Sequence, residues 1–340
     1  MRYQQKKQLI ILLLSLSLTL IFGLISSENF KPTPVNAQSP PNFAIPIDCT
    51  LGENCFILHY VDLDPSSEAV DFNCGRQTYD THNGTDFGVS DLQVMQKGVP
   101  VTAAAAGTVL RVRDGMPDKL VEDQTDKAAV EDVECGNGLV IDHGNGWETQ
   151  YCHLRNGSLK VEPGTKVEQG TVLGMVGASG LASFPHVHLT IRYQNKVVDP
   201  FVGVNPSPGC NIQRTPLWEE TLKYNPTGLI RAGFAPKPPE QTELWEGKFT
   251  ETTIPQNSPA IIFWVQSYGV LQGDVEYYQV IAPSGEVAIK QENILEKPYR
   301  SWVSFVGKRN IEEVGMWQGK YQLKRDGNIL IDIQRQVEVK

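Results

Sequence analysis

The sequence predicts an all-β protein in which a compact antiparallel β domain is followed by a small β-sandwich domain. Short segments rich in Val, Ile and aromatic residues recur between Gly and Pro, as is typical of antiparallel strands and their turns. No long stretch carries the apolar period of about 3.6 residues that indicates an amphipathic helix. A proline-rich segment interrupts the strand pattern, and a length of 340 residues favours about two domains.

Residues 1–37 are predicted to be a secretory signal peptide. A basic start precedes an apolar stretch over residues 9–25, and the small residues Val35 and Ala37 stand at positions −3 and −1 of the expected cleavage site. We therefore expect a periplasmic or secreted protein. The apolar stretch also approaches the length of a membrane-spanning helix, so an uncleaved membrane anchor is the alternative.

The first domain is expected over residues 43–205. Residues 99–112 are predicted to form two strands that break near a glycine. Residues 138–143 and 148–153 are predicted to form a hairpin, because a Gly-Asn-Gly turn lies between them. Residues 187–193 are expected to be a central strand of the same sheet.

An acid-rich insertion over residues 114–134 interrupts this strand pattern. We expect a solvated surface loop. The alternative is a lid or wall beside a binding cleft, because long ordered loops in compact domains often serve that role.

A proline-rich linker is predicted over residues 206–240, followed by a β-sandwich over residues 241–340. The C-terminal domain contains no His and no Cys, so we expect no catalytic chemistry there. Contact with the cell wall or a glycan through tryptophan stacking is one option for this domain, but buried core is the expected role of Trp245, Trp264, Trp302 and Trp317. The predicted strands are 261–265, 275–281, 302–306, 320–324 and 329–333.

The charge argues against nucleic acid as a partner. The formal net charge is −9, and no compact cluster of Lys and Arg follows the first seven residues. Proteins that bind the phosphate backbone of nucleic acids carry basic patches.

The six cysteines predict a disulfide framework. An even cysteine count is typical of exported chains, and no CxxC pair favours a metal site here. Six cysteines allow about fifteen complete pairings, so spacing does not decide the connectivity. Our hypothesis pairs Cys49 with Cys55, Cys74 with Cys210, and Cys135 with Cys152.

Four positions predict a metal centre in the first domain. His82 and Asp86 stand four residues apart, and His186 and His188 stand at i and i+2. In a strand, side chains at i and i+2 project from the same face. Three N or O ligands with an open fourth position make a catalytic zinc site. Because both pairs occur together, with His153 between them, the sequence favours such a site over isolated structural histidines.

The remaining histidines, His59 and His143, are expected to be hydrogen-bonded structural residues, although His143 could also line the cleft. The glycine-rich residues 174–180 lack the Lys-Ser/Thr pair and the helix of a phosphate-binding loop. We interpret them as turn glycines.

Residues 46–201 resemble the M23, or lysostaphin-like, metallopeptidases, whose domains are of the LytM type. The resemblance covers nearly the full length of such a domain. It is carried by residues 82–87 (HNGTDF), 101–109 (VTAAAAGTV), 138–144 (GLVIDHG), 151–154 (YCHL), the glycine series at 164–180, 186–188 (HVH) and 198–200 (VDP).

The resemblance implies a zinc metalloendopeptidase that hydrolyses peptide bonds in peptidoglycan stem peptides or cross-bridges. The zinc ligands would be His82, Asp86 and His188, and the catalytic residues His153 and His186 would flank the metal-bound water. The sequence departs from the common pattern at Phe184, where the family often has a small Thr-Gly segment. We expect this bulkier side chain at the cleft wall, where it would alter substrate preference.

The alternative is a catalytically silent LytM-like regulator that binds the cell wall or partner enzymes. Members of that kind typically lose one or more metal ligands. This sequence retains all three ligands and both flanking histidines, which favours the enzyme.

Overall fold

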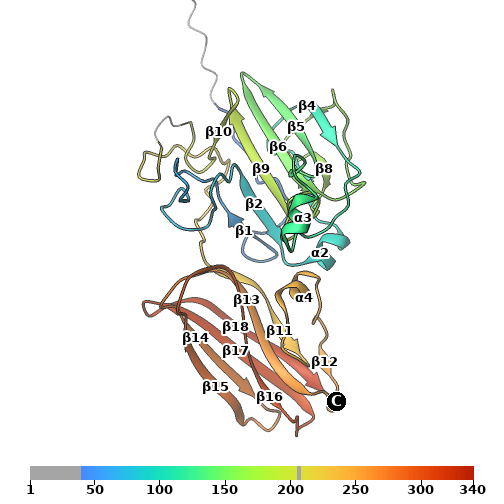
Figure 1. Cartoon of the computed structure of the whole chain (residues 1–340), viewed down its shortest axis with the longest axis vertical. Coiled ribbons are helices and arrows are strands. Elements are labelled where there is room, and N and C mark those ends of the chain that lie inside the picture. The colour runs from blue at the N-terminus through green and yellow to red at the C-terminus, as the bar shows by residue number, and fades with distance from the viewer. Residues whose placement is uncertain (1–39, 205–207) are drawn as a thin grey trace, which may run out of the picture. The chain divides into compact units, whose positions relative to one another are not determined.

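The structure, a computed structural model, describes residues 40–204 and 208–340. Strands dominate these residues, nearly all of them antiparallel, and the helices are short, which confirms the all-β prediction (Figure 1). The predicted signal peptide, residues 1–37, lies outside the described residues. Within the described ranges, no helix is both long enough and apolar enough to cross a membrane.

The first domain is organised around one eight-stranded sheet with the order β1-β2-β9-β6-β5-β4-β7, in which β10 also pairs with β9 (Figure 1). A separate two-stranded sheet joins β3 to β8. The strands are β1 (Cys55–His59), β2 (Thr85–Val89), β3 (Pro100–Thr102), β4 (Gly107–Arg113), β5 (Asn137–Gly144), β6 (Trp147–Leu154), β7 (Lys166–Val167), β8 (Val172–Met175), β9 (His186–Tyr193) and β10 (Lys196–Val198).

The strand predictions for this domain are confirmed. The expected break separates β3 from β4, and the expected hairpin is β5 and β6. Strand β9 lies between β2 and β6, in the middle of the sheet. At the centre of the core of this domain, Phe43, Ile141 and Leu154 expose no surface.

The acid-rich insertion contains the short helix α3 (Gln124–Ala128), and its Asp118 forms an isolated antiparallel bridge with Ser179. The backbone N–H groups of Lys119 and Val121 donate to the carbonyls of Ala178 and Ala182. The insertion is therefore tied to the domain at one side, where the carboxylates of Asp114 and Asp118 also accept backbone N–H groups of the domain. Another short helix, α2 (Leu92–Lys97), follows β2.

The C-terminal domain is a sandwich of a three-stranded sheet, β11-β13-β16, and a five-stranded sheet, β12-β18-β17-β14-β15. Apolar side chains of both sheets form one core, which contains Phe263, Trp317 and Leu323. The elements are β11 (Gly228–Ala235), α4 (Gln241–Trp245), β12 (Thr253–Ile254), β13 (Ala260–Val270), β14 (Val275–Ile281), β15 (Val287–Ile294), β16 (Tyr299–Arg309), β17 (Gly315–Arg325) and β18 (Asn328–Val339).

The predicted linker over residues 206–240 is wrong in its second half. Residues Gly228–Ala235 form β11, which pairs with β13 along its whole length. The prolines at 236, 238 and 239 that suggested a linker follow directly after this strand, so they end β11 rather than belong to a long irregular segment.

The tryptophans of the C-terminal domain have the expected core role. Trp245, Trp264 and Trp317 are buried, and Trp302 is half-buried with its indole N–H donating to Glu276. Of the four tryptophans of this domain, only Trp302 is therefore partly exposed.

The disulfide hypothesis is confirmed in full. Bonds join Cys49 to Cys55, Cys74 to Cys210, and Cys135 to Cys152. Among the described residues no cysteine is free.

Side chains from beyond residue 227 join the core of the first domain. Ile230, Trp245 and Tyr268 belong to its apolar cluster. The half-buried Arg231 guanidinium lies 3.3 Å from the carboxylate of Asp91, which also caps α2 by accepting from the N–H of Val94. The C-terminal domain thus packs against the same apolar cluster that supports the site described next.

Candidate metal centre

Two neighbouring strands carry the predicted site residues. In the antiparallel pairing of β2 with β9, Asp86 lies opposite His188 and Gly88 lies opposite His186. The intervening Phe87 and Val187 expose no surface. Because alternate residues of a strand point to opposite faces, burial of these two apolar side chains turns Asp86, His186 and His188 toward the other face.

The predicted ligands converge as the sequence indicated. Asp86 Oδ1 lies 2.8 Å from His188 Nδ1 and 3.2 Å from His82 Nε2. The two imidazole nitrogens are 3.2 Å apart. His82, Asp86 and His188 are all buried, and one ligand atom from each lies within 4.8 Å of the other two. Two imidazoles and one carboxylate are a donor set that suits zinc.

The far side of each imidazole supports metal binding. His82 Nδ1 lies 2.6 Å from the carbonyl oxygen of Tyr60, so that nitrogen carries the proton and donates it. His188 Nε2 lies 3.0 Å from Asn83 Oδ1 and 3.0 Å from Thr190 Oγ1. In both rings an acceptor fixes the protonated nitrogen, which leaves the lone pair of the other nitrogen facing the cluster. The residues present therefore fit a zinc ion.

The carboxylate at the centre stays ionised. Burial by itself would raise the pKa of Asp86, but the surrounding imidazoles, His82 and His186 first among them, hold that pKa well below its ordinary value. An ionised carboxylate is the form that binds a cation.

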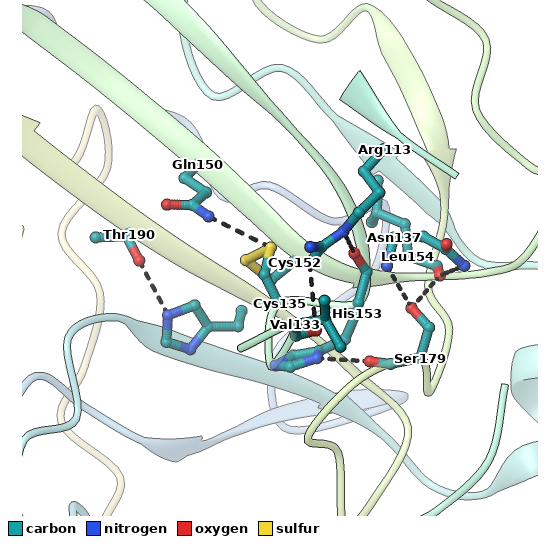
Figure 2. Close-up of a disulfide and its surroundings, with 12 residues drawn as sticks. Arg113, Val133, Cys135, Asn137, Gln150, Cys152, His153, Leu154, Ser179 and Thr190 are labelled. Carbon is teal, nitrogen blue, oxygen red and sulfur yellow. Dashed lines mark hydrogen bonds between the residues drawn. A yellow bond between two sulfur atoms is a disulfide. The ribbon is translucent and has the colours of Figure 1, made fainter. Parts of the chain in front are cut away.

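The two other predicted site histidines lie against this group. Their rings are 4.6 Å apart, and His186 Nε2 lies 3.6 Å from Asp86 Oδ1. The Nδ1–H of His153 donates to the carbonyl of Ser179, and that of His186 donates to the carbonyl of Phe184, each at 2.8 Å (Figure 2 shows the His153 bond). Each ring therefore keeps its Nε2 lone pair unprotonated and available.

Both of these histidines are neutral at neutral pH. Burial lowers the pKa of His186 to about 4. Burial, together with the imidazoles of His186 and His188, lowers the pKa of His153 well below its ordinary value. A neutral imidazole can accept a proton, so each ring can act as a base.

The backbone at His153 is held in an unusual conformation. Its φ of 63° lies in the left-handed region that few residues other than glycine adopt. The N–H of His153 donates to the carbonyl of Cys135, whose disulfide to Cys152 clamps the same turn (Figure 2). The disulfide therefore supports the backbone geometry that aims the His153 ring.

A polar cleft borders the centre. His82, His153 and His188 line this cleft, whereas the buried Asp86 and His186 are not among its lining residues. The insertion reaches this cleft only through its last residue, Glu134. The other lining residues are Tyr79, Thr81, Asn83, Cys135, Gln150, Cys152, Leu181, Thr190 and Arg192.

The expectation for Phe184 is wrong. Its side chain is 3% exposed and packs behind His186, away from the residues that line the cleft. The reason is that the neighbouring Phe56 and Trp245 supply an apolar contact surface on the inner side. Phe184 therefore acts on the shape of the site through His186 rather than on the substrate directly.

The two remaining histidines differ in their surroundings. His143 bonds to the carbonyl of Ala106 and to Thr149 Oγ1, as a structural residue does, and lies outside the cleft. His59, expected to be of the same kind, instead lies 2.9 Å from Asp86. No local motif marks His59, because only the pairing of β1 with β2 brings it opposite Asp86.

A buried His-Asp-His ligand set with further imidazoles at a polar cleft, within an antiparallel β domain, is the arrangement of a metallopeptidase. Comparison with known proteins leads to the same class. Residues 80–200 match the sequence model of peptidase family M23.

Curated relatives match over the same part of the chain. Cell division protein DipM of Caulobacter vibrioides is 30% identical over 123 residues, which are 36% of this chain and 19% of that protein. Peptidoglycan DD-endopeptidase ShyB of Vibrio cholerae is 30% identical over 118 residues, 35% of this chain and 22% of that protein. The chain thus spans about a fifth of the length of these relatives.

Among solved structures, a zinc-containing peptidase from Vibrio cholerae aligns with 43% of this chain and 39% of its own, at 26% identity and a TM-score of 0.27.

Proposed function

We propose that this protein is a zinc-dependent endopeptidase that hydrolyses peptide bonds in peptidoglycan stem peptides or cross-bridges. The observation that carries the proposal is the convergence of His82, Asp86 and His188 beside two neutral imidazoles. The match of residues 80–200 to the model of peptidase family M23 and a relative named as a peptidoglycan DD-endopeptidase support the substrate class.

Zinc is the metal that the donor set favours, and His82, Asp86 and His188 would hold it. When bound there, zinc supplies Lewis-acid chemistry that polarises a peptide carbonyl and lowers the pKa of water.

The proton transfers fall to His153 and His186. Water attacks the carbonyl carbon and gives up a proton, and the C–N bond breaks as the leaving amine takes one up. Because His153 lines the cleft and keeps a free Nε2, it is the better placed of the two to accept the first proton and return it to the amine. His186, whose ring lies 4.6 Å from that of His153 and whose Nε2 is also unprotonated, would be the second proton acceptor.

The cleft suits a peptide rather than an apolar ligand. Besides the site histidines, it presents Thr81, Asn83 and Gln150, whose side chains pair with amide groups, and the charged Glu134 and Arg192. Extended peptides and their carboxylates offer complementary donors and acceptors.

We also propose that the chain is exported, with residues 1–37 removed as a signal peptide and the mature protein in the periplasm or outside the cell. Three disulfides support an oxidising compartment. In this proposal residues 43–205 form the peptidase domain and residues 241–340 the larger part of the β-sandwich domain.

The test uses the chain without its first 37 residues, incubated with purified peptidoglycan. We expect about one zinc per chain and the release of muropeptides with new peptide termini, as measured by elemental analysis and mass spectrometry. His188→Ala should lose both. The matched control is His143→Ala, which removes a histidine outside the cleft and should keep both.

Two results would change the proposal. A zinc-loaded protein that releases no peptides would favour the alternative, a catalytically silent regulator. A protein that binds no zinc would overturn the metallopeptidase itself.

A further inference from the structure

The two oxygens of Asp86 have different neighbours. Oδ1 faces the ligand group, with the nearest nitrogens of His188, His82 and His186 at 2.8, 3.2 and 3.6 Å. Oδ2 points the other way and lies 2.9 Å from His59 Nδ1. A carboxylate oxygen only accepts, so the Nδ1–H of His59 is the donor.

The fold holds His59 in this position. His59 ends β1 and lies opposite Asp86 in β2, where the register shifts after Ile57. Its side chain is 12% exposed. Ring contacts with Tyr79 at 5.2 Å, His82 at 5.8 Å and Phe184 at 5.9 Å enclose the imidazole on several sides. The ring therefore has little freedom to turn away from Asp86.

The direction of this hydrogen bond has a consequence for metal binding. A carboxylate that is free to rotate can offer both oxygens to a cation, as it commonly does toward calcium. A catalytic zinc site keeps three protein ligand atoms and an open fourth position. With Oδ2 held by His59, only Oδ1 of Asp86 faces His82 and His188.

We propose that His59 is a positioning residue of the metal centre, which holds the outer oxygen of Asp86 so that the carboxylate presents one oxygen to the metal. This inference rests on the zinc site of the proposed function and extends it to a residue outside the ligand set. Outer hydrogen-bond partners of metal ligands typically contribute about 10- to 100-fold to metal affinity.

The test compares three variants of the full mature chain. His59→Ala removes the donor, and we expect zinc affinity to fall about 10- to 100-fold in competition with a chromophoric chelator. His59→Asn retains an N–H donor near the place of Nδ1 and should recover most of the affinity. His143→Ala is the matched control and should bind zinc as the unaltered protein does.

Two further measurements separate positioning from folding. Thermal unfolding of the chelator-treated proteins reports the stability of each variant without metal. The visible absorption of the cobalt-substituted proteins reports coordination number, and we expect His59→Ala to lose intensity as a second carboxylate oxygen joins, while His59→Asn retains the spectrum.

The inference is overturned if His59→Ala, folded, binds zinc as tightly as the unaltered protein. It is also overturned if His59→Asn folds but binds zinc as weakly as His59→Ala, because the ring packing would then matter and the hydrogen bond would not. Failure of the proposed function would give a different result. If the unaltered protein binds zinc but releases no peptides, the peptidase activity is contradicted and the role of His59 in zinc binding is not. Absence of zinc binding in the unaltered protein would end both proposals.

Discussion

The ring of Phe184 lies face to face with the imidazole of His186, with centroids 4.2 Å apart and an interplanar angle of 14°. On its other sides Phe184 contacts Phe56 and the indole of Trp245, with centroid distances of 6.4 and 5.7 Å. Since the carbonyl of Phe184 also accepts the Nδ1–H bond of His186, one residue sets both the plane and the tautomer of that imidazole. Trp245, from the C-terminal domain, supports the arrangement from behind.

Phe184→Ala is expected to impair the turnover of the enzyme as well as its stability. Loss of a buried phenyl ring typically lowers the free energy of unfolding by about 3–5 kcal/mol. Removal of the stacked ring also frees the His186 imidazole, so kcat should fall at least 10-fold with a smaller change in KM. Denaturant unfolding and steady-state kinetics on a muropeptide measure the two effects.

The matched control for Phe184 is Phe234→Ala in the β-sandwich. Phe234 is 4% exposed, contacts Phe263 and belongs to the sandwich core, which contains no histidine. It should lose a similar amount of stability while the folded protein keeps its kcat. An unchanged kcat in Phe184→Ala would show that the stacking does not position His186.

Gly84→Ala is expected to disrupt metal binding by steric contact alone. A Cβ at this position would lie 2.5 Å from His188 Nε2 and 2.6 Å from the carbonyl oxygen of Leu189. The backbone oxygen is held by the sheet, so relief requires the His188 ring or the strand to move. We expect at least a 10-fold loss of zinc affinity, measured by chelator competition.

Gly144→Ala serves as the comparison for Gly84→Ala. At Gly144 nothing lies within 4 Å of an added Cβ, but the φ of 78° makes alanine strained there. That variant should lose about 1 kcal/mol of stability and keep its zinc affinity. Equal zinc affinity in the two variants would contradict the steric explanation.

The disulfides are expected to differ in their effect on the site. Cys135–Cys152 closes a loop with a sequence separation of 17, and Cys49–Cys55 one of 6. The chain-entropy model predicts that replacing a pair by serines lowers the free energy of unfolding by about 3 kcal/mol for Cys135–Cys152 and by about 2 kcal/mol for Cys49–Cys55. Only the first replacement should also lower kcat, because Cys135 holds the backbone of His153.

Urea unfolding of the two double-serine variants, with kinetics on the folded fraction, measures this difference. If both variants keep the original kcat, the Cys135–Cys152 bond has no role in aiming His153.

Asp199 is expected to make stability depend on pH. Its Oδ1 accepts from the N–H of Phe201 at 2.7 Å, but Oδ2 has no hydrogen-bond partner among the described residues. Burial raises the pKa of Asp199 to about 7. In the unfolded chain the pKa of this carboxyl is near 4, so the folded state binds the proton more tightly. The contribution of the protonated Asp199 to the free energy of unfolding is therefore present in full below about pH 4 and is lost as the pH rises to about 7.

Asp199→Asn removes this titration and keeps the acceptor for Phe201. From pH 5 to pH 8 the free energy of unfolding of the unaltered protein should fall by on the order of 2 kcal/mol more than that of the variant. Urea unfolding at both pH values measures this difference. Parallel pH dependence of the two proteins would contradict a buried, protonated Asp199.

The common face of His186 and His188 could be predicted from local spacing, whereas the choice of His82, Asp86 and His188 as ligands followed from the family resemblance. His186 and His188 alternate along one strand, so they share a face whatever packs around them. The hairpin of β5 and β6 followed in the same way from its Gly-Asn-Gly turn. Such features depend on backbone geometry within a few residues, which the sequence carries directly.

Predictions failed where contacts between distant segments decide the outcome. Nothing near Phe184 in the sequence shows whether its ring faces the cleft or the interior, and the surfaces of Phe56 and Trp245 decide this. Strand β11 was missed because the prolines after it dominate the local composition, whereas its pairing with β13 is what makes it a strand.

The sequence by itself therefore determined the class of fold, the disulfide-bonded character of the chain, and the residues His82, Asp86, His153, His186 and His188 as one candidate site. Only the tertiary structure decided how that site is supported. His59 reaches Asp86 because β1 pairs with β2 after a shift in register, and Trp245 reaches Phe184 from the C-terminal domain. These contacts join residues between 27 and 61 positions apart, and packing rather than chain connectivity brings them together.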